Sequence, residues 1–189
     1  LDLKRVAAVA KIASKSSIIL DANQGYSAQE TLAFLKLLAK AKIRIDLIEQ
    51  PTVKADIEGL QQVSRLSKIT VCADESASSL EDVIGLIHEK AVGAINIKLM
   101  KTGIIHSLEI ARLAKANGLK LMIGGMMESN LAMSASAHLA CGLGFFDYVD
   151  LDTPFFIKGE VARNPSLRTD GCYDLSKVKA GIGIKPKVV

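Results

Sequence analysis

The sequence has no tryptophan, and aromatic residues make up only 4% of its 189 residues. Proteins that bind single-stranded nucleic acid stack bases on aromatic side chains, so this scarcity argues against such a function. The charge is also nearly balanced, with 24 Lys and Arg against 20 Asp and Glu, and the basic residues form no dense cluster. We therefore expect no nucleic-acid partner.

Long apolar runs are scarce as well. No stretch of about 18 uncharged apolar residues occurs, which argues against a transmembrane helix. Lys4, Lys11 and Lys15 interrupt the first apolar stretch, unlike the apolar centre of a secretory leader. Three widely spaced cysteines form neither a disulfide framework nor a CxxC metal motif. These features predict a cytoplasmic protein without membrane contact.

Hydrophobic residues, by contrast, make up 49% of the chain, which is enough for a sizeable core. Many of them fall into six short apolar runs that are each too short for a helix. Most of the runs lack strict in–out alternation, as is typical of strands buried on both faces of a parallel sheet. The predicted strands are 17–20, 45–48, 69–72, 94–97, 119–123 and 148–149.

Longer amphipathic segments, in which apolar residues recur at helical spacing, separate these runs. Ser27 with Glu30, and Ser78 with Glu81, have the spacing of a capping box at the start of a helix. The chain therefore alternates strands and helices. This order predicts right-handed crossovers and a parallel sheet.

The fold class follows from this repeat. A Rossmann domain would carry a GxGxxG motif between a strand and a helix, and the sequence has none. We therefore predict an α/β fold of the (β/α)-barrel type. Only six strands are visible, and the chain opens in a helix that should itself follow a strand. The barrel is expected to be incomplete, with its first strands absent from this piece of a longer or processed chain.

The repeat also suggests where the barrel ends. Residues 1–160 are predicted to form the partial barrel, which would be the catalytic domain. From 161 to 189 the repeat gives way to proline, glycine and charged residues. This change indicates a C-terminal return segment or tail.

Polar residues stand where the predicted strands end. Asp21, Glu49, Asp74 and Lys98 each follow an apolar run, at intervals of 28, 25 and 24 residues. We interpret them as equivalent positions in successive strand–helix units. In a parallel barrel the carboxyl ends of the strands gather at one mouth, where catalytic residues lie.

Three carboxylates at one mouth would repel each other unless a cation lay between them. Ligands that are all oxygen favour Mg²⁺, with Mn²⁺ as a substitute. A lysine buried at such a mouth can acquire a pKa suited to proton abstraction. The alternative interpretation is local: a single Asp after a strand is commonly a helix cap or a turn residue.

Further candidates flank this set. Asp150 and Asp152 lie two residues apart after the last strand and hence on one face, although solvation or helix capping would also explain them. Asn23 and Glu75 lie next to the predicted ligands and could support them by hydrogen bonds, or simply shape turns. Lys101 could contribute its charge to the site, or be solvated at a helix start.

Four segments together resemble the enolase superfamily, and more closely its muconate-lactonizing subgroup. They are DANQGY at 21–26, IEQP at 48–51, ADES at 73–76 and NIKLMKTG at 96–103. Within the subgroup the sequence is most similar to dipeptide epimerases of the L-Ala-D/L-Glu epimerase type. Met127 and Ser129 in the segment MES, and Asp150 and Asp152 in the segment DLD, carry that closer resemblance.

The resemblance implies roles for these residues. Asp21, Glu49 and Asp74 would bind Mg²⁺, and Lys98 would be one of two acid/base lysines facing opposite sides of the substrate α-carbon. The pair Asp150 and Asp152 would hold the α-ammonium group of a dipeptide, which is a charge-assisted contact. Met127 and Ser129 would line the substrate site.

The implied reaction is abstraction of the proton α to a carboxylate through an enediolate, which in an epimerase inverts that carbon. The second lysine belongs to a Lys-x-Lys motif on a strand that would precede Leu1, and a capping domain would also lie upstream. We therefore expect the 189 residues alone to be inactive without the N-terminal part of the same enzyme. The family often forms homo-oligomers, although no surface feature of this sequence points to one.

Two alternatives stay open at this point. An o-succinylbenzoate synthase or a muconate cycloisomerase would use the same metal site on a substrate without an ammonium group. The chain could also be a non-catalytic piece that only binds metal. A change from the family pattern, Gly103-Ile104 in place of a double glycine, affects only a loop.

Overall fold

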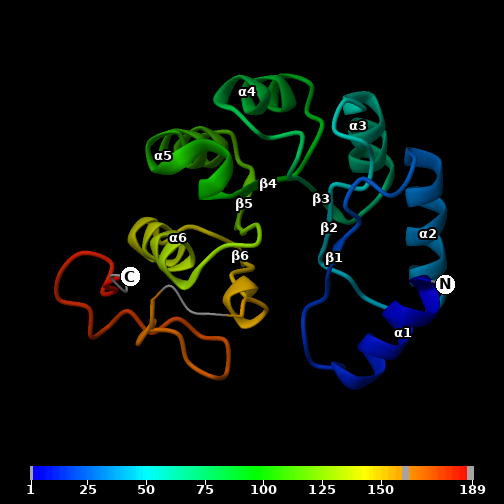
Figure 1. Ribbon diagram of the computed structural model, residues 1–189. Coiled ribbons are helices and arrows are strands. Elements are labelled where there is room, and N and C mark those ends of the chain that lie inside the picture. Colours follow the sequence, from blue (N-terminus) through cyan, green and yellow to red (C-terminus); the bar gives the residue numbers. More distant parts are fainter. Residues whose placement is uncertain (1, 159–161, 187–189) are drawn as a thin grey trace. The chain divides into compact units, whose positions relative to one another are not determined.

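The computed structural model describes residues 2–158 and 162–186 (Figure 1). The chain divides into two compact units, Leu1–Ile95 and Asn96–Val189. Both units repeat the strand–helix order that the sequence predicts. In the described ranges, no helix combines the length and apolarity needed to cross a bilayer.

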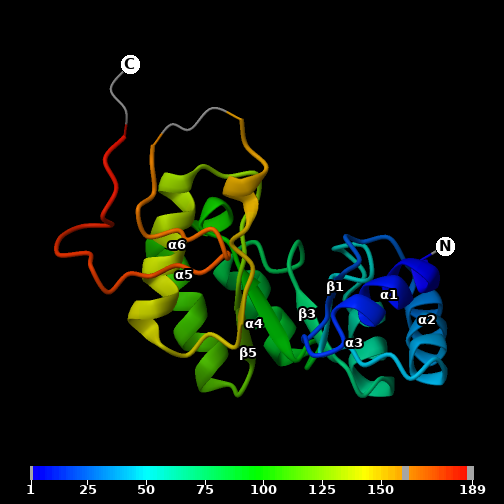
Figure 2. The same cartoon turned by 90° about the horizontal axis from the view of Figure 1, so that it is seen from below.

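The first unit contains four helices and the strands between them. Helices α2 and α3 lie side by side along one face of β1–β3 (Figures 1 and 2). Its elements are α1 (Asp2–Ile12), β1 (Ile19–Asp21), α2 (Ala28–Lys40), β2 (Leu47–Glu49), α3 (Ile57–Leu66), β3 (Thr70–Ala73), α4 (Leu80–His88) and the start of β4 (Ala94–Ile97).

The second unit begins within β4 and continues the repeat. A long helix and a shorter one alternate with two more strands, and a 3₁₀ turn follows the last strand. The elements are α5 (Leu99–Ala116), β5 (Lys120–Ile123), α6 (Asn130–Leu143), β6 (Tyr148–Val149) and η1 (Thr153–Phe155).

The strand order equals the chain order from β1 to β6, and the recorded pairings are parallel. Six parallel strands linked by helices confirm the predicted fold class, an incomplete (β/α) barrel. Each strand lies within two residues of its predicted run. Strands β4 and β6 match theirs without a shift.

The cores also follow the prediction that strands are buried on both faces. Every residue of β2 and β4 is buried. In the first unit Leu47 and Leu60 are fully buried between strand and helix, and in the second Leu121 and Met133 are. Burial of large apolar side chains of this kind is the dominant stabilising contribution to such domains.

One of the two predicted helix caps is confirmed and the other is displaced. Ser27 Oγ accepts the Glu30 N–H at 3.2 Å, and the Glu30 carboxylate accepts the Ser27 N–H at 2.8 Å. The second predicted box, Ser78 with Glu81, is wrong by one position. Helix α4 begins at Leu80, so its cap is Ser79, which accepts the Asp82 N–H at 3.1 Å.

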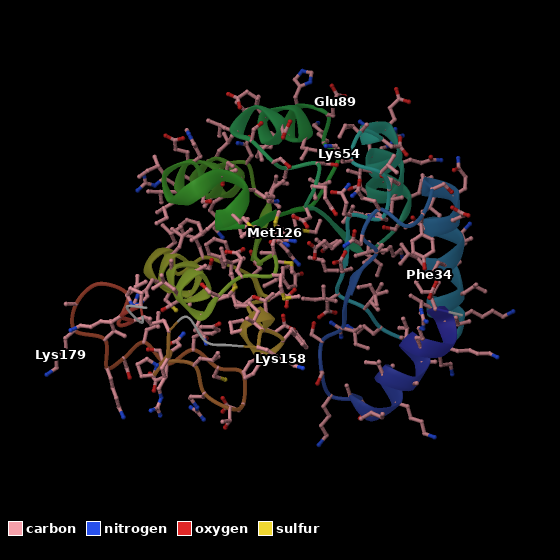
Figure 3. The ribbon with its side chains drawn as sticks, viewed as in Figure 1. Phe34, Lys54, Glu89, Met126, Lys158 and Lys179 are labelled. Carbon is pink, nitrogen blue, oxygen red and sulfur yellow. The ribbon has the colours of Figure 1, made fainter. Side chains whose placement is uncertain are left out.

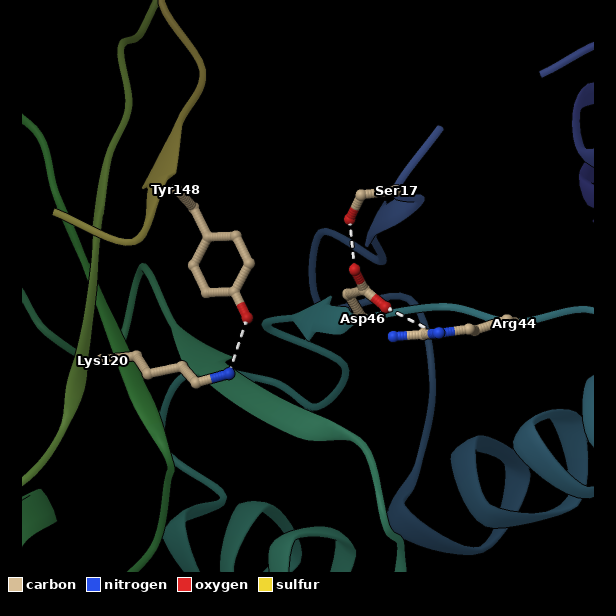
Figure 4. Close-up of polar contacts among 5 residues, drawn as sticks. All are labelled: Ser17, Arg44, Asp46, Lys120 and Tyr148. Atoms are coloured by element: carbon tan, nitrogen blue, oxygen red, sulfur yellow. Dashed lines mark hydrogen bonds and ion pairs between the residues drawn. The ribbon is translucent and has the colours of Figure 1, made fainter. Parts of the chain in front are cut away.

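The amino-terminal ends of the strands are tied by charged and hydroxyl groups. Ser17 Oγ donates a hydrogen bond to Asp46 beside β2, and Arg44 Nε lies 3.3 Å from the same carboxylate (Figure 4). In the second unit, Lys120 Nζ donates to Tyr148 Oη at 3.0 Å across β5 and β6 (Figure 4). These contacts lie at the amino-terminal ends of the strands. In (β/α) barrels that face contributes to stability, and the catalytic residues lie at the opposite face.

The tail belongs to the second unit, and its described residues, 162–186, form no helix or strand. Ser134 Oγ on α6 donates to the Ile182 carbonyl at 3.1 Å, and Tyr173 Oη donates to the Leu151 carbonyl at 2.8 Å. The predicted boundary between residues 160 and 161 falls within 159–161, which lie outside the described residues. It therefore stays a prediction.

Candidate metal and substrate site at the strand ends

The three predicted metal ligands all lie in the first unit, at the carboxyl ends of neighbouring strands. Asp21 is the register partner of Glu49, and Glu49 is the partner of Cys72. Asp74 therefore lies two residues beyond the register of the other two. The expectation of equivalent positions holds for Asp21 and Glu49 and is wrong by two residues for Asp74.

This offset is compatible with a shared site. Neighbouring strands lie about 4.8 Å apart, and residues two apart on a strand project to the same face. Closing a sheet into a barrel also requires the strands to be staggered in register. The two-residue step thus keeps Asp74 on the face that Asp21 and Glu49 share.

The three carboxylates differ in their surroundings. Glu49 is only 2% exposed and Asp74 only 6%, whereas Asp21 is exposed. One Asp21 oxygen accepts the backbone N–H of Asn23 at 2.8 Å, and Asn23 has a positive φ of 44°. This is an Asx turn, so the backbone of Asn23 has the turn role considered from the sequence.

The donor set fits a hard cation in chemistry. All three side chains offer only oxygen, which suits Mg²⁺ or Mn²⁺. In the part of the chain that the structure describes, however, no three His, Cys, Asp or Glu side chains are grouped as metal ligands. The assignment of this trio to a metal stays a prediction.

A glutamine that the sequence analysis did not select lies at the centre of these strand ends. Gln50 is completely buried. Its Oε1 accepts the backbone N–H groups of Asp74 at 2.9 Å and Ser76 at 3.1 Å. Its Nε2 donates to the Thr52 carbonyl at 3.1 Å and to Ser76 Oγ at 2.8 Å. The feature of the sequence that could have identified Gln50 is its position between the predicted ligand Glu49 and a proline.

A second glutamine connects the three loops that follow β1, β2 and β3. Gln24 Oε1 accepts the Lys54 N–H at 2.9 Å, and Gln24 Nε2 donates to Glu75 Oε1 at 3.1 Å. Ser76 Oγ in turn donates to the Lys54 carbonyl at 2.8 Å. Figure 3 labels Lys54 in the loop between β2 and α3. Glu75, which was predicted to support the metal ligands, thus connects the loop after β3 to the loop after β1.

Lys98 belongs to the second unit, directly after β4. It is the N-cap residue of α5, with extended backbone angles, and is partly buried. The predicted supporting residue Lys101 donates its Nζ to the Asn96 carbonyl at 2.9 Å. Gly103 has a φ of 70° and kinks α5, so the departure from the family's double glycine falls at a break in that helix.

The strand next to Lys98 depends on a glycine. A Cβ at Gly124, after β5, would lie 2.7 Å from the side-chain amide of Asn96. Real Cβ atoms essentially never come that close, so a larger residue here would force the buried Asn96 side chain to shift. The structure thus gives Gly124 a packing role beside the buried Asn96.

Asp150 and Asp152 follow β6, and both are exposed. The Asp150 N–H donates to the Ile123 carbonyl at 2.9 Å, which extends the pairing of β5 and β6. Leu151 between them is only 5% exposed. The two exposed carboxylates therefore flank a buried residue that anchors their segment.

Tyr173 holds this segment from the tail, a contact that was not predicted from the sequence. Its hydroxyl donates to the carbonyl of Leu151. Burial, and then the charge of Asp152, raise the pKa of Tyr173 to about 12. The tyrosine therefore stays protonated, and able to donate, throughout the neutral range.

The loop after β5 carries the other predicted substrate residues. Met127 is 67% exposed and so lies open to a ligand, and its neighbour Met126 is 42% exposed (Figure 3). Ser129 is the N-cap of α6 and accepts the Ala132 N–H at 3.4 Å, so its hydroxyl already has a structural partner. A role for Ser129 in substrate binding stays a prediction.

A buried glutamate shapes the same loop. Glu128 is only 4% exposed, and its Oε1 accepts the Met126 N–H at 2.9 Å. Thr153 Oγ1 donates to the Glu128 carbonyl at 3.2 Å and so joins the loops after β5 and β6. In the sequence, Glu128 is notable only as the central residue of the segment MES.

Known proteins resemble the chain along its whole length. A hydrophobic dipeptide epimerase of Citrifermentans bemidjiense is 52% identical and covers 99% of the chain and 52% of that protein. An L-Ala-D/L-Glu epimerase of Thermotoga maritima is 44% identical and covers 88% of the chain and 48% of that protein. The chain thus spans about half the length of the curated relatives it matches.

Solved structures agree with the sequence matches. The dipeptide epimerase of Enterococcus faecalis V583, solved with Mg and the dipeptide L-Leu-L-Tyr, has a TM-score of 0.90 and 32% identity. The match covers 97% of this chain and 52% of that one. The model of the enolase C-terminal domain-like family matches residues 1–188. The chain therefore belongs to the enolase C-terminal domain-like family, as the four sequence motifs predicted.

Proposed function

We propose that this chain is the barrel portion of a Mg²⁺-dependent dipeptide epimerase, an isomerase that acts on the carbon α to a carboxylate. The proposal is supported by relatives that are named dipeptide epimerases and by the structure solved with Mg and a dipeptide. It is also supported by the register of Asp21 and Glu49, with Asp74 two residues further on the same face.

In this proposal the first unit binds the metal. Asp21, Glu49 and Asp74 hold Mg²⁺, or Mn²⁺ in its place. The bound cation would withdraw electrons from the substrate carboxylate and make the neighbouring C–H more acidic. The buried positions of Glu49 and Asp74 exclude water, which strengthens their electrostatic interactions.

The second unit supplies the proton transfer and the recognition of the substrate. Lys98 exchanges a proton with the α-carbon from one face, and the resemblance assigns the opposite face to a lysine upstream of residue 1. Asp150 and Asp152 accept hydrogen bonds from the substrate ammonium group, and Met127 contacts a side chain of the dipeptide. Two carboxylates on one anchored segment suit a cation with three N–H donors.

The names of the relatives allow two kinds of dipeptide. One relative acts on hydrophobic dipeptides and another on L-Ala-D/L-Glu. Two exposed methionines lie on the loop after β5, which a hydrogen bond joins to the segment after β6. They favour a dipeptide with an apolar side chain, with L-Ala-L-Glu as the reference substrate.

Hydrogen exchange in D₂O tests the proposal. The intact protein with Mg²⁺ should place deuterium at a single α-carbon of a dipeptide, as followed by NMR, with inversion at that carbon. The same dipeptide with an acetylated N-terminus should exchange far more slowly. Absence of exchange with every dipeptide in a panel of acidic, aromatic and aliphatic side chains would reject the function.

A further inference from the structure

Gln50 links the backbone at two predicted metal ligands, Glu49 and Asp74. Gln50 directly follows Glu49 in the chain. The Gln50 side chain accepts the backbone N–H of Asp74 at 2.9 Å. The Gln50 N–H also donates to the Cys72 carbonyl at 2.9 Å, which continues the pairing of β2 with β3. The glutamine therefore connects one ligand to another by both its backbone and its side chain.

The environment of Gln50 leaves it a single arrangement. Its amide has two N–H donors and an oxygen with two acceptor positions, and all four are occupied. It is completely buried, so water cannot replace a lost partner. Its φ of 32° lies in the left-handed region, which L residues rarely adopt and which persists only where the surroundings enforce it.

The register explains why such a brace is needed. Asp74 lies two residues beyond the partner of Glu49 and one residue past the end of β3. Strand pairing alone therefore does not fix its backbone. The hydrogen bond from the Asp74 N–H to Gln50 Oε1 does so across the two chain segments.

We propose that Gln50 is a positioning residue for the metal site. It holds the carboxylates of Glu49 and Asp74 at the separation that a divalent cation requires. This inference rests on the proposed function, because it takes that carboxylate trio as the metal site. Groups that orient metal ligands in this way typically change metal affinity about 10- to 100-fold when they are removed.

The test measures Mn²⁺ binding by EPR on the intact protein, without substrate. Gln50→Met keeps the length and approximate volume of the side chain but removes all four hydrogen bonds. We expect it to raise the Kd for Mn²⁺ by about 10- to 100-fold. If Gln50→Met fails to fold, Gln50→Asn takes its place, because its shorter amide cannot span the same distance to the Asp74 N–H.

Two control variants separate positioning from general stability. Thr31→Val removes a hydrogen bond of a fully buried hydroxyl on α2, from Thr31 Oγ1 to the Ser27 carbonyl at 2.8 Å. Ser76→Ala disturbs the network of Gln50 but leaves the bond to the Asp74 N–H. Both should keep the Kd for Mn²⁺ within about threefold of the wild-type value, whatever they do to the unfolding midpoint.

The outcomes distinguish this inference from the function on which it rests. Wild-type protein that binds no Mn²⁺ would reject both. Wild-type binding together with an unchanged Kd in Gln50→Met would reject the positioning role alone. A rise in Kd as large in Ser76→Ala as in Gln50→Met would also reject it, because the bond to Asp74 would then not matter.

Discussion

The loops at the carboxyl ends of the strands differ sharply between the two units. After β1, β2 and β3 the loops are joined by hydrogen bonds through Gln24 and Gln50, and two of the three carboxylates are buried. After β5 and β6 they expose Met127, Asp150 and Asp152.

This difference matches two different tasks. A metal site needs its ligands held at fixed separations, and buried hydrogen bonds supply that rigidity. A site for substrate side chains needs open, adaptable surface, which methionine provides through its flexible thioether. In the proposed epimerase the first region would hold the metal and the second would contact the substrate.

The largest expected effect concerns the lysine after β4. In the intact protein, Lys98→Met should lower kcat for epimerisation by about 10³-fold, because general acid–base groups contribute 10²- to 10⁴-fold. The Kd for Mn²⁺ should change little, since Lys98 lies outside the metal trio. Lys36→Met on α2, an exposed position, is the matched control. Full activity in Lys98→Met would remove this lysine from the mechanism.

A smaller loss is expected at the anchored carboxylates. Asp150→Asn should lower kcat/KM for a dipeptide about 10- to 100-fold, because hydrogen bonds to charged groups contribute roughly 1.5–3 kcal/mol. Activity on an N-acetylated dipeptide, which has no ammonium group, should not fall further. Glu58→Gln on α3 serves as the control. Equal losses on both substrates would contradict recognition of the ammonium group by Asp150, whereas a synthase or cycloisomerase, whose substrates carry no amine, would tolerate the change without loss.

Met127 tests whether the open region sets specificity. Met127→Ser should lower kcat/KM for dipeptides with an apolar side chain about tenfold relative to L-Ala-L-Glu, the size of effect that an apolar contact has on discrimination. The free energy of unfolding should stay within about 0.5 kcal/mol, as is usual at exposed positions. Met100→Ser, also exposed, provides the comparison. An unchanged substrate preference would exclude Met127 from the substrate site.

The smallest effect is expected at the tail. Tyr173→Phe removes the hydrogen bond to Leu151 and should lower the free energy of unfolding by about 1 kcal/mol. Folded Tyr173 has a pKa of about 12, above its ordinary value of 10.0. Its contribution to stability is therefore complete below pH 10 and is lost as the pH rises toward 12.

Absorbance titration of the three tyrosines checks this prediction. The variant should lack the latest rise in tyrosinate absorbance, and its stability should depend less on pH between 10 and 12. Denaturant unfolding at pH 8 measures the hydrogen bond itself. A wild-type tyrosine titration that is complete by pH 10.5 would contradict the raised pKa.

Much of the site could be predicted because strand ends are marked locally. Asp21 and Glu49 follow apolar runs of the same kind, and their equal register was predicted from chain intervals alone. Asp74 was displaced by two residues because stagger between strands is a property of the whole sheet, which intervals do not encode. The cap at Ser79 was missed by one residue because two adjacent serines offer the same local signal.

The sequence by itself determined the alternation of strands and helices, the fold class and the family, because short apolar runs and helix caps are local features with local causes. Only the tertiary structure revealed the roles of Gln50 and Tyr173. The side chain of Gln50 accepts hydrogen bonds from groups 24 and 26 positions away, and Tyr173 donates one to a carbonyl 22 positions away. Hydrogen bonds between remote segments form only after packing brings the segments together, so the order of residues alone does not disclose them.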